Sequence, residues 1–121
     1  MFDWLRRRGS VPAASTREWH VSVEDGILVV VERGQDRAFA RVPTAGARSV
    51  RVVPLTRGTH HAAANGWQVA LAQADGDVLI GQPLPEWQSA RELARKVCAA
   101  ASLPMDATTE KLFSRVGQIK L

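Results

Sequence analysis

Short runs of apolar and β-branched residues, separated by turn residues, fill the first half of the chain. Residues 19–24 and 27–32 are two such runs, and Asp25-Gly26 lies between them. An Asp-Gly pair is typical of a two-residue hairpin turn because both positions tolerate positive φ. After two further turns the pattern predicts strands over 37–42 and 48–53, so that four short strands form an antiparallel meander.

A second hairpin is expected after a long irregular segment. Residues 54–66 show neither clear alternation nor a helix start signal, and they predict a long loop. Alternation then returns in residues 67–73 and 77–81, on either side of a turn at Asp75-Gly76. The chain therefore contains about six predicted strands.

The spacing of apolar residues changes from two to three and four after Pro85, which predicts an amphipathic helix over 85–101. Trp87 and Cys98 lie on its apolar stripe, and charged residues occupy the opposite face. Proline is favoured in a first helical turn because its missing N–H would be unpaired there. Leu103-Pro104 is expected to end this helix.

The elements together predict an α+β fold, an antiparallel β-meander or roll of about six to seven strands closed by the C-terminal amphipathic helix. Asp106 is expected to cap a short second helix that runs to about Val116 and ends at Gly117. Residues 1–16 are expected to form a flexible N-terminal arm, because glycine, serine and proline follow a single apolar turn. Residues 17–121 then form a single β-rich domain.

Composition indicates the cellular compartment of this domain. The single cysteine, Cys98, excludes an internal disulfide, and the N-terminus lacks the apolar region of a signal peptide. The longest apolar run, residues 27–31, is far shorter than the roughly twenty residues of a membrane-spanning helix. We therefore expect a protein of the cytoplasm, and thirteen arginines against three lysines suit a GC-rich bacterial genome.

The net charge of +4 and the pI of about 10.2 raise nucleic-acid binding as an alternative function. Acidic residues interrupt most of the basic ones, so no long basic tract forms. A nucleic-acid surface would use six arginines: Arg6, Arg7, Arg8, Arg48, Arg51 and Arg57.

The sequence lacks the common catalytic and cofactor motifs, so we predict neither an enzyme nor a bound cofactor or metal. Cys98 is expected to be a buried small hydrophobe, and His60-His61 is the only local cluster of metal-ligand type. Neither a Gly-x-Ser-x-Gly elbow nor a phosphate-binding loop is present. An active site assembled from distant residues would need His20 or His61 beside a carboxylate.

Strands in two curved layers followed by an amphipathic C-terminal helix, here Trp87 to Ala101, resemble the pleckstrin-homology-like small β-barrels. The resemblance covers element order over residues 18–102, with six strands where seven are usual and a place for the seventh within 55–66. It implies a binding scaffold that reads peptides or phosphoinositide headgroups through loops and sheet edges. The loop between the first two strands, Asp25-Gly26, is acidic, which disfavours headgroup binding.

These observations favour a non-enzymatic protein-interaction module, of adaptor or scaffold type, as the main hypothesis. The partner would bind either an exposed strand edge or a surface formed by Arg48, Arg51, Arg57, His60 and His61. A second candidate is a docking arm formed by Phe2, Trp4, Arg6, Arg7 and Arg8. A symmetric homodimer and a monomer are both compatible with the sequence.

Overall fold

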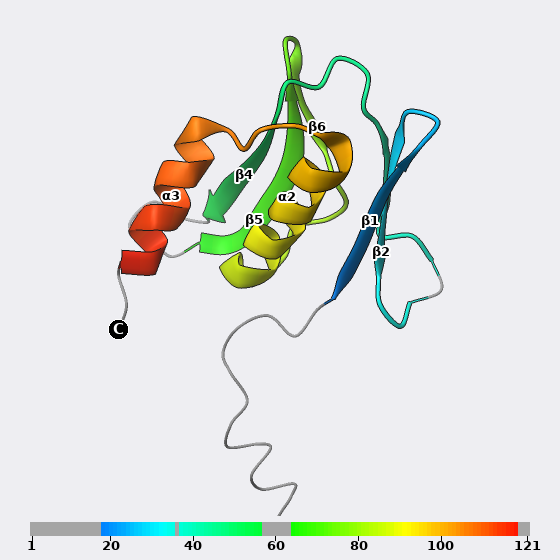
Figure 1. Ribbon diagram of the computed structural model, residues 1–121. Helices are drawn as coiled ribbons and strands as arrows, with labels where there is room; N and C mark the ends of the chain where they lie inside the picture. Colours follow the sequence, from blue (N-terminus) through cyan, green and yellow to red (C-terminus); the bar gives the residue numbers. More distant parts are fainter. Residues whose placement is uncertain (1–17, 36, 57–63, 119–121) are drawn as a thin grey trace, which may run out of the picture.

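The computed structural model describes residues 18–35, 37–56 and 64–118, and Figure 1 shows their arrangement. Six strands precede two helices along this part of the chain. The strands are β1 (Trp19–Glu24), β2 (Ile27–Glu32), β3 (Ala40–Pro43), β4 (Ser49–Thr56), β5 (Ala64–Gln73) and β6 (Gly76–Leu79). The helices are α2 (Trp87–Ala101) and α3 (Ala107–Gln118). The α+β class is therefore confirmed.

The strands form two separate antiparallel sheets, ordered β1-β2-β3 and β4-β5-β6, so the predicted single meander of six to seven strands is wrong. Pro43 ends β3, and a turn follows in which the Ala47 N–H donates to the Thr44 carbonyl at 3.0 Å. The Arg48 N–H then donates to Ala72 at 2.8 Å. The chain thus passes from one sheet to the other, and neither described sheet closes into a barrel.

The first predicted hairpin is confirmed, and the second is confirmed with a shifted turn. Asp25 and Gly26 have φ values of 54° and 77°, as a two-residue turn between facing strands requires. In the second hairpin Gln73 pairs with Gly76, so the turn residues are Ala74 and Asp75 rather than Asp75-Gly76.

Several predicted boundaries move because tertiary contacts extend or shorten the strands. The predicted loop over 54–66 is wrong at both ends, since β4 continues to Thr56 and β5 begins at Ala64. A register shift between Leu55 and Thr56 accompanies this extension. The third strand begins at Ala40 instead of residue 37, and Phe39 before it stacks edge-on against Trp19 at 4.9 Å between ring centroids.

The core lies between the two sheets and α2. Leu28 and Val30 from one sheet, Val50 and Leu71 from the other, and Leu93 from α2 are all fully buried. In Figure 1, α2 lies between the β1-β2 hairpin and the sheet of β4 and β5, and α3 lies beyond β4 on the other side. One amphipathic helix therefore covers the apolar faces of both sheets.

The helix ends agree with the sequence predictions except at the start of α2 and the end of α3. Trp87 begins α2 and Glu86 is its N-cap, so Pro85 precedes the helix instead of opening it. Ser102, with a φ of 56°, ends α2 in the left-handed conformation. Asp106 caps α3 by accepting from the Thr108 N–H at 3.1 Å, as predicted. The helix continues to Gln118, and the predicted end at Gly117 is wrong.

Neither helix among the described residues is long and apolar enough to cross a membrane.

Candidate functional site

Two of the predicted site residues, Arg48 and Arg51, lie in the described part of the chain, and they do not form a cluster. Arg48 is exposed where the chain enters the second sheet, and its backbone N–H pairs with Ala72. The Arg51 guanidinium contacts Asp77 at 3.2 Å across the outer face of that sheet. The other predicted residues lie outside the described part of the chain: Phe2, Trp4, Arg6, Arg7, Arg8, Arg57, His60 and His61.

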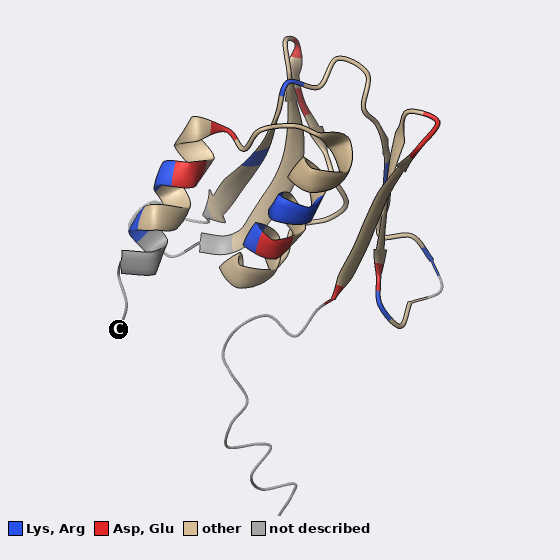
Figure 2. Ribbon diagram, in the orientation of Figure 1, with Lys and Arg blue, Asp and Glu red and all other residues tan. Residues whose placement is uncertain are grey.

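Charge is balanced over the described residues, which contain ten basic and ten acidic side chains. The net charge of +4 therefore comes from the residues outside them. Figure 2 shows the described basic and acidic residues spread over both helices and the hairpin ends. The high pI does not correspond to an excess of basic side chains on the described domain.

The free edge of β4 is closed by the chain itself. The Val50 N–H donates to the Pro104 carbonyl at 2.9 Å, and the Val50 carbonyl accepts from the Asp106 N–H at 2.8 Å. Two residues further along β4, the Val52 N–H donates to Thr109 Oγ1 at 3.0 Å. Thr109 is only 1% exposed. The connection between α2 and α3 thus satisfies this edge, and another strand cannot pair there.

The edges formed by β3 and β6 are short. Each strand has four residues, and Pro43 in β3 has no N–H to offer. Leu79 in β6 is 57% exposed, but Asp77 beside it is engaged with Arg51. Short, charged or proline-containing edges are poor templates for an added strand.

The edge of β1 is longer and remains open along part of its length. The Arg33 N–H donates to the Glu18 carbonyl at 2.8 Å, so alternate residues from Glu18 face β2 and those between them face outward. Lys96 Nζ donates to the outward carbonyl of Trp19 at 2.8 Å. Further along, the outward backbone groups of Val21 and Val23 have no hydrogen-bond partner within 18–35, 37–56 or 64–118.

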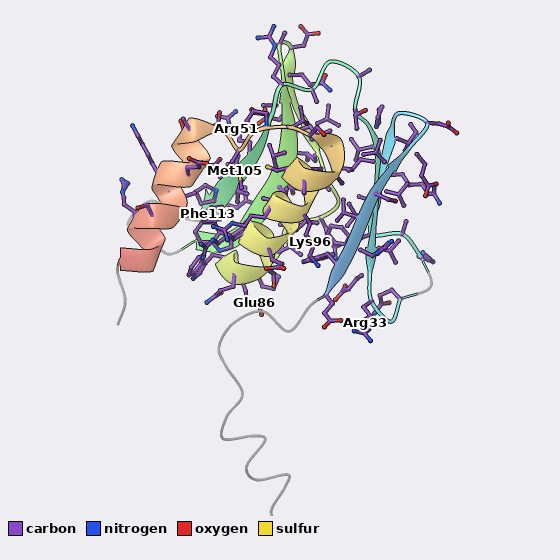
Figure 3. The ribbon with its side chains drawn as sticks, viewed as in Figure 1. Arg33, Arg51, Glu86, Lys96, Met105 and Phe113 are labelled. Atoms are coloured by element: carbon purple, nitrogen blue, oxygen red, sulfur yellow. The ribbon has the colours of Figure 1, made fainter. Side chains whose placement is uncertain are left out.

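A groove of about 550 Å³ lies between α2 and the start of β1, before the open part of the edge at Val21 and Val23. Figure 3 shows Lys96 on the side of α2 that faces β1, and Arg33 at the lower end of the first sheet. Six residues line the groove: Glu18, Trp19, His20, Arg33, Glu92 and Lys96. Its walls therefore combine the start of β1, an apolar ring and charges of both signs.

The charges of the groove are paired within it. Glu18 forms an ion pair with Arg33, and this hydrogen bond and charge lower the pKa of the Glu18 carboxyl. Lys96 lies 3.9 Å from Glu92, one turn earlier on α2. His20 shares the groove with both carboxylates, yet no hydrogen bond joins it to either of them. The groove thus lacks a histidine and carboxylate pair suited to proton transfer.

The other candidate groups for chemistry do not form a site among the described residues. No group of three or more metal-ligand side chains occurs there. Cys98 packs against the core but is half-buried instead of buried as predicted, and burial raises the pKa of its thiol, which lowers the fraction of reactive thiolate.

The sequence reasoning missed Lys96 and Thr109. Lys96 contacts the edge of β1, and Thr109 contacts the edge of β4. Lys96 contacts a carbonyl 77 residues away, and Thr109 contacts an N–H 57 residues away. Neither residue stands out from the ordinary polar positions of an amphipathic helix.

Comparison of the chain with protein-family models, curated proteins and solved structures finds no match in any of the three.

Proposed function

We propose that this protein is a non-enzymatic interaction module, of adaptor or scaffold type, that binds an extended segment of a partner protein along β1. One observation carries the proposal: the outward groups of Val21 and Val23 are open, whereas the chain covers the edge of β4 with its own residues. Proteins usually block long strand edges, so an edge left open suits a binding role.

The partner segment would add a strand to the first sheet. Its main chain would pair with the outward N–H and carbonyl groups of Val21 and Val23, and its side chains would alternate between the two faces of the sheet. Lys96 already occupies the carbonyl of Trp19, so pairing would run from Val21 toward Glu24. The paired charges of Glu18 and Arg33 at one end would set the register of the segment.

The element order agrees with this role. It resembles the pleckstrin-homology-like barrels, which act as binding scaffolds, although both sheets described here are open. A cytoplasmic location fits a chain with one cysteine. A surface formed by Arg57, His60 and His61 remains a second version of the proposal. Joint substitution of Arg57 and His61 by alanine without loss of partner binding would exclude that version.

The edge version is tested by removing one outward N–H. A library of random peptides displayed on phage is selected against the full chain, and the affinity of the selected peptides is then measured by calorimetry. Val23→Pro removes an N–H that makes no bond to β2, so the fold should persist. We expect Val23→Pro to weaken peptide binding by about tenfold, as the loss of one well-formed hydrogen bond implies.

Val23→Thr is the matched control, because it keeps both the N–H and the β-branched shape. Circular dichroism confirms that both variants fold. The edge proposal is refuted if the library yields no binder, or if Val23→Pro and Val23→Thr bind the selected peptides equally well.

Nucleic-acid binding is the alternative that the pI raises, and the charge balance of the described residues lends it little support. It predicts an affinity for DNA or RNA that falls steeply as salt is raised. A pull-down from native lysate with and without nuclease separates the two functions. A partner protein retained after nuclease supports the module, and loss of all bound material supports nucleic acid.

A further inference from the structure

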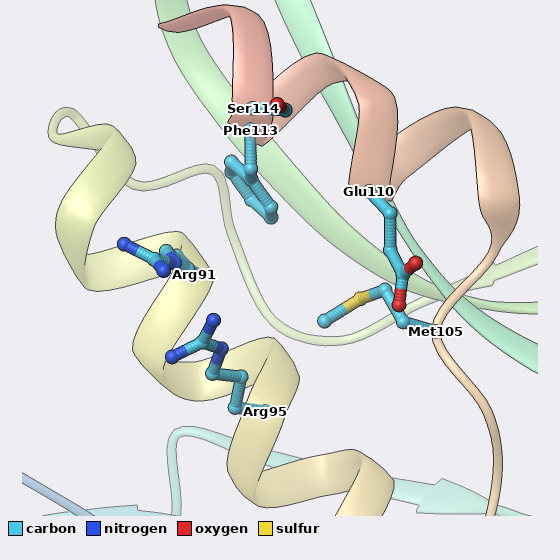
Figure 4. A pocket seen from close by; sticks show the side chains of 6 residues that line it. All are labelled: Arg91, Arg95, Met105, Glu110, Phe113 and Ser114. Carbon is cyan, nitrogen blue, oxygen red and sulfur yellow. The ribbon is translucent and has the colours of Figure 1, made fainter. Parts of the chain in front are cut away.

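Helix α3 presents different residues to its two neighbours, α2 and β4. Figure 4 shows Glu110 and Phe113 on the side of α3 that faces α2. A second stripe, with residues three and four positions apart, lies toward β4, where a cleft of about 280 Å³ opens. In this cleft β4 contributes residues 51–54, and α3 contributes Lys111, Leu112 and Arg115 among others.

The floor of the cleft is apolar. Val53 and Leu112 are both half-buried, and Pro54 beside them is exposed. Thr109 closes the inner end, because its hydroxyl is engaged with the backbone of β4. The cleft is slightly smaller than the usual small-molecule site, which has a volume of about 300–1,000 Å³. It therefore suits a single apolar side chain of a larger partner.

Three basic side chains surround this floor, and no acidic residue is among the described residues that line the cleft. Lys111 and Arg115 lie one helical turn apart, and both are exposed. Neither has a carboxylate partner within 18–35, 37–56 or 64–118. Arg51 enters from β4, where Asp77 contacts it at 3.2 Å. Charge is balanced over the described domain as a whole, but at this cleft it is positive.

We propose that the cleft binds an acidic segment of a partner protein, one that carries an apolar side chain between carboxylates. The apolar side chain packs on Val53 and Leu112, and the carboxylates accept hydrogen bonds from Lys111 and Arg115. A nucleic-acid backbone would also neutralise the two cations, but its phosphates would leave the apolar floor uncovered. The floor and the charges together therefore favour an acidic peptide.

This cleft is separate from the β1 edge, so its test does not depend on the proposed function. In Figure 1, α2 lies between β1 and the second sheet, and α3 lies beyond β4. The cleft and the groove at the start of β1 share no lining residue. A molecule with both surfaces would hold two partner segments at once, which is the action expected of an adaptor.

The proposal is tested with three pentapeptides that have blocked ends. They are Glu-Glu-Leu-Glu-Glu, Gln-Gln-Leu-Gln-Gln, which lacks the charges, and Glu-Glu-Ser-Glu-Glu, which lacks the apolar side chain. Each peptide is titrated into the full chain, and the backbone amide signals of Val53, Lys111 and Leu112 are followed by NMR. We expect the first peptide to bind with a Kd of about 1 mM and the other two to bind about tenfold more weakly.

Substitutions separate the charges from the floor. Lys111→Gln combined with Arg115→Gln should weaken binding of Glu-Glu-Leu-Glu-Glu by about fivefold, because two exposed ion pairs are lost. Arg37→Gln combined with Arg41→Gln is the matched control. It removes the same charge from exposed arginines outside the cleft and should change the affinity by less than about twofold. Val53→Thr keeps the β-branched shape and should reduce the preference for the leucine peptide over the serine peptide by about threefold.

Absence of binding by Glu-Glu-Leu-Glu-Glu at about 10 mM would overturn the proposal. Equal affinity of this peptide for wild type and the Lys111 and Arg115 double variant would overturn it as well, as would equal binding by all three peptides. A short oligothymidylate that binds more tightly than the acidic peptide, and loses affinity in the same double variant, would assign the cleft to nucleic acid.

Discussion

Thr109 offers the sharpest test of how the second sheet is protected. Its hydroxyl accepts the Val52 N–H at 3.0 Å and lies 3.5 Å from the Val52 carbonyl, and both residues are almost completely buried. Thr109→Val replaces this hydroxyl with a methyl group of nearly the same size. The β-branched shape and the packing remain, but the Val52 N–H loses its only acceptor among the described residues.

The magnitude follows from that unsatisfied group. A buried donor left without a partner costs about 1–3 kcal/mol, so the free energy of unfolding should fall by that amount. The midpoint of thermal unfolding should fall by roughly 4 °C for each kcal/mol lost in a domain of this size. Urea unfolding followed by tryptophan fluorescence gives the free energy, and its denaturant slope should not change because the exposed surface is the same.

Thr108→Val is the matched control for this experiment. Thr108 is the preceding residue of α3 and is exposed, so the same chemical change should alter stability by no more than about 0.5 kcal/mol. If Thr109→Val loses no more stability than Thr108→Val, the hydroxyl does not close the β4 edge. The contrast between open and closed edges, on which the proposed function depends, would then fail.

Two further predictions concern a glycine and an ion pair. Gly81 and Gly34 both have positive φ, but an added Cβ would lie 2.6 Å from Phe39 Cζ at Gly81 and would meet nothing at Gly34. Gly81→Ala should therefore cost about 1–3 kcal/mol more than Gly34→Ala in urea unfolding, and equal losses would contradict the close contact. Arg33 lowers the pKa of Glu18 below its usual 4.5, so the pair contributes stability above the unfolded pKa and loses it as pH falls through the folded pKa. Wild type should melt above Glu18→Gln at neutral pH, and the two should converge as the pH falls through the lowered pKa of Glu18; a difference that persists in stronger acid would exclude the ion pair as its cause.

Local structure was largely predictable because it depends on neighbouring residues. Asp25-Gly26 specifies a turn through its own backbone preferences, and the apolar stripe of 85–101 specifies a helix through its spacing. Asp106 caps the next helix within two residues. Each of these features needs only a few adjacent side chains.

The sequence did not predict which strands share a sheet or which sheet edges are open. The turn after Pro43 looks like a hairpin in sequence, but it passes the chain to a second sheet because the Arg48 N–H finds Ala72. The open edge of β1 and the closed edge of β4 depend on Lys96 and Thr109, which reach across the fold. The contact between the helices likewise requires knowing that Phe113 packs against Trp87. These pairings are set by packing, which periodicity does not encode.

The position of α2 also has a consequence for folding during synthesis. Both sheets present apolar faces that this helix covers, and its residues are made after all six strands. A nascent chain that has not yet released residues 87–101 holds two hairpin-based sheets with uncovered valine and leucine side chains. Cooperative folding must therefore wait for the helix to emerge, and until then the strands are exposed to aggregation and to chaperones.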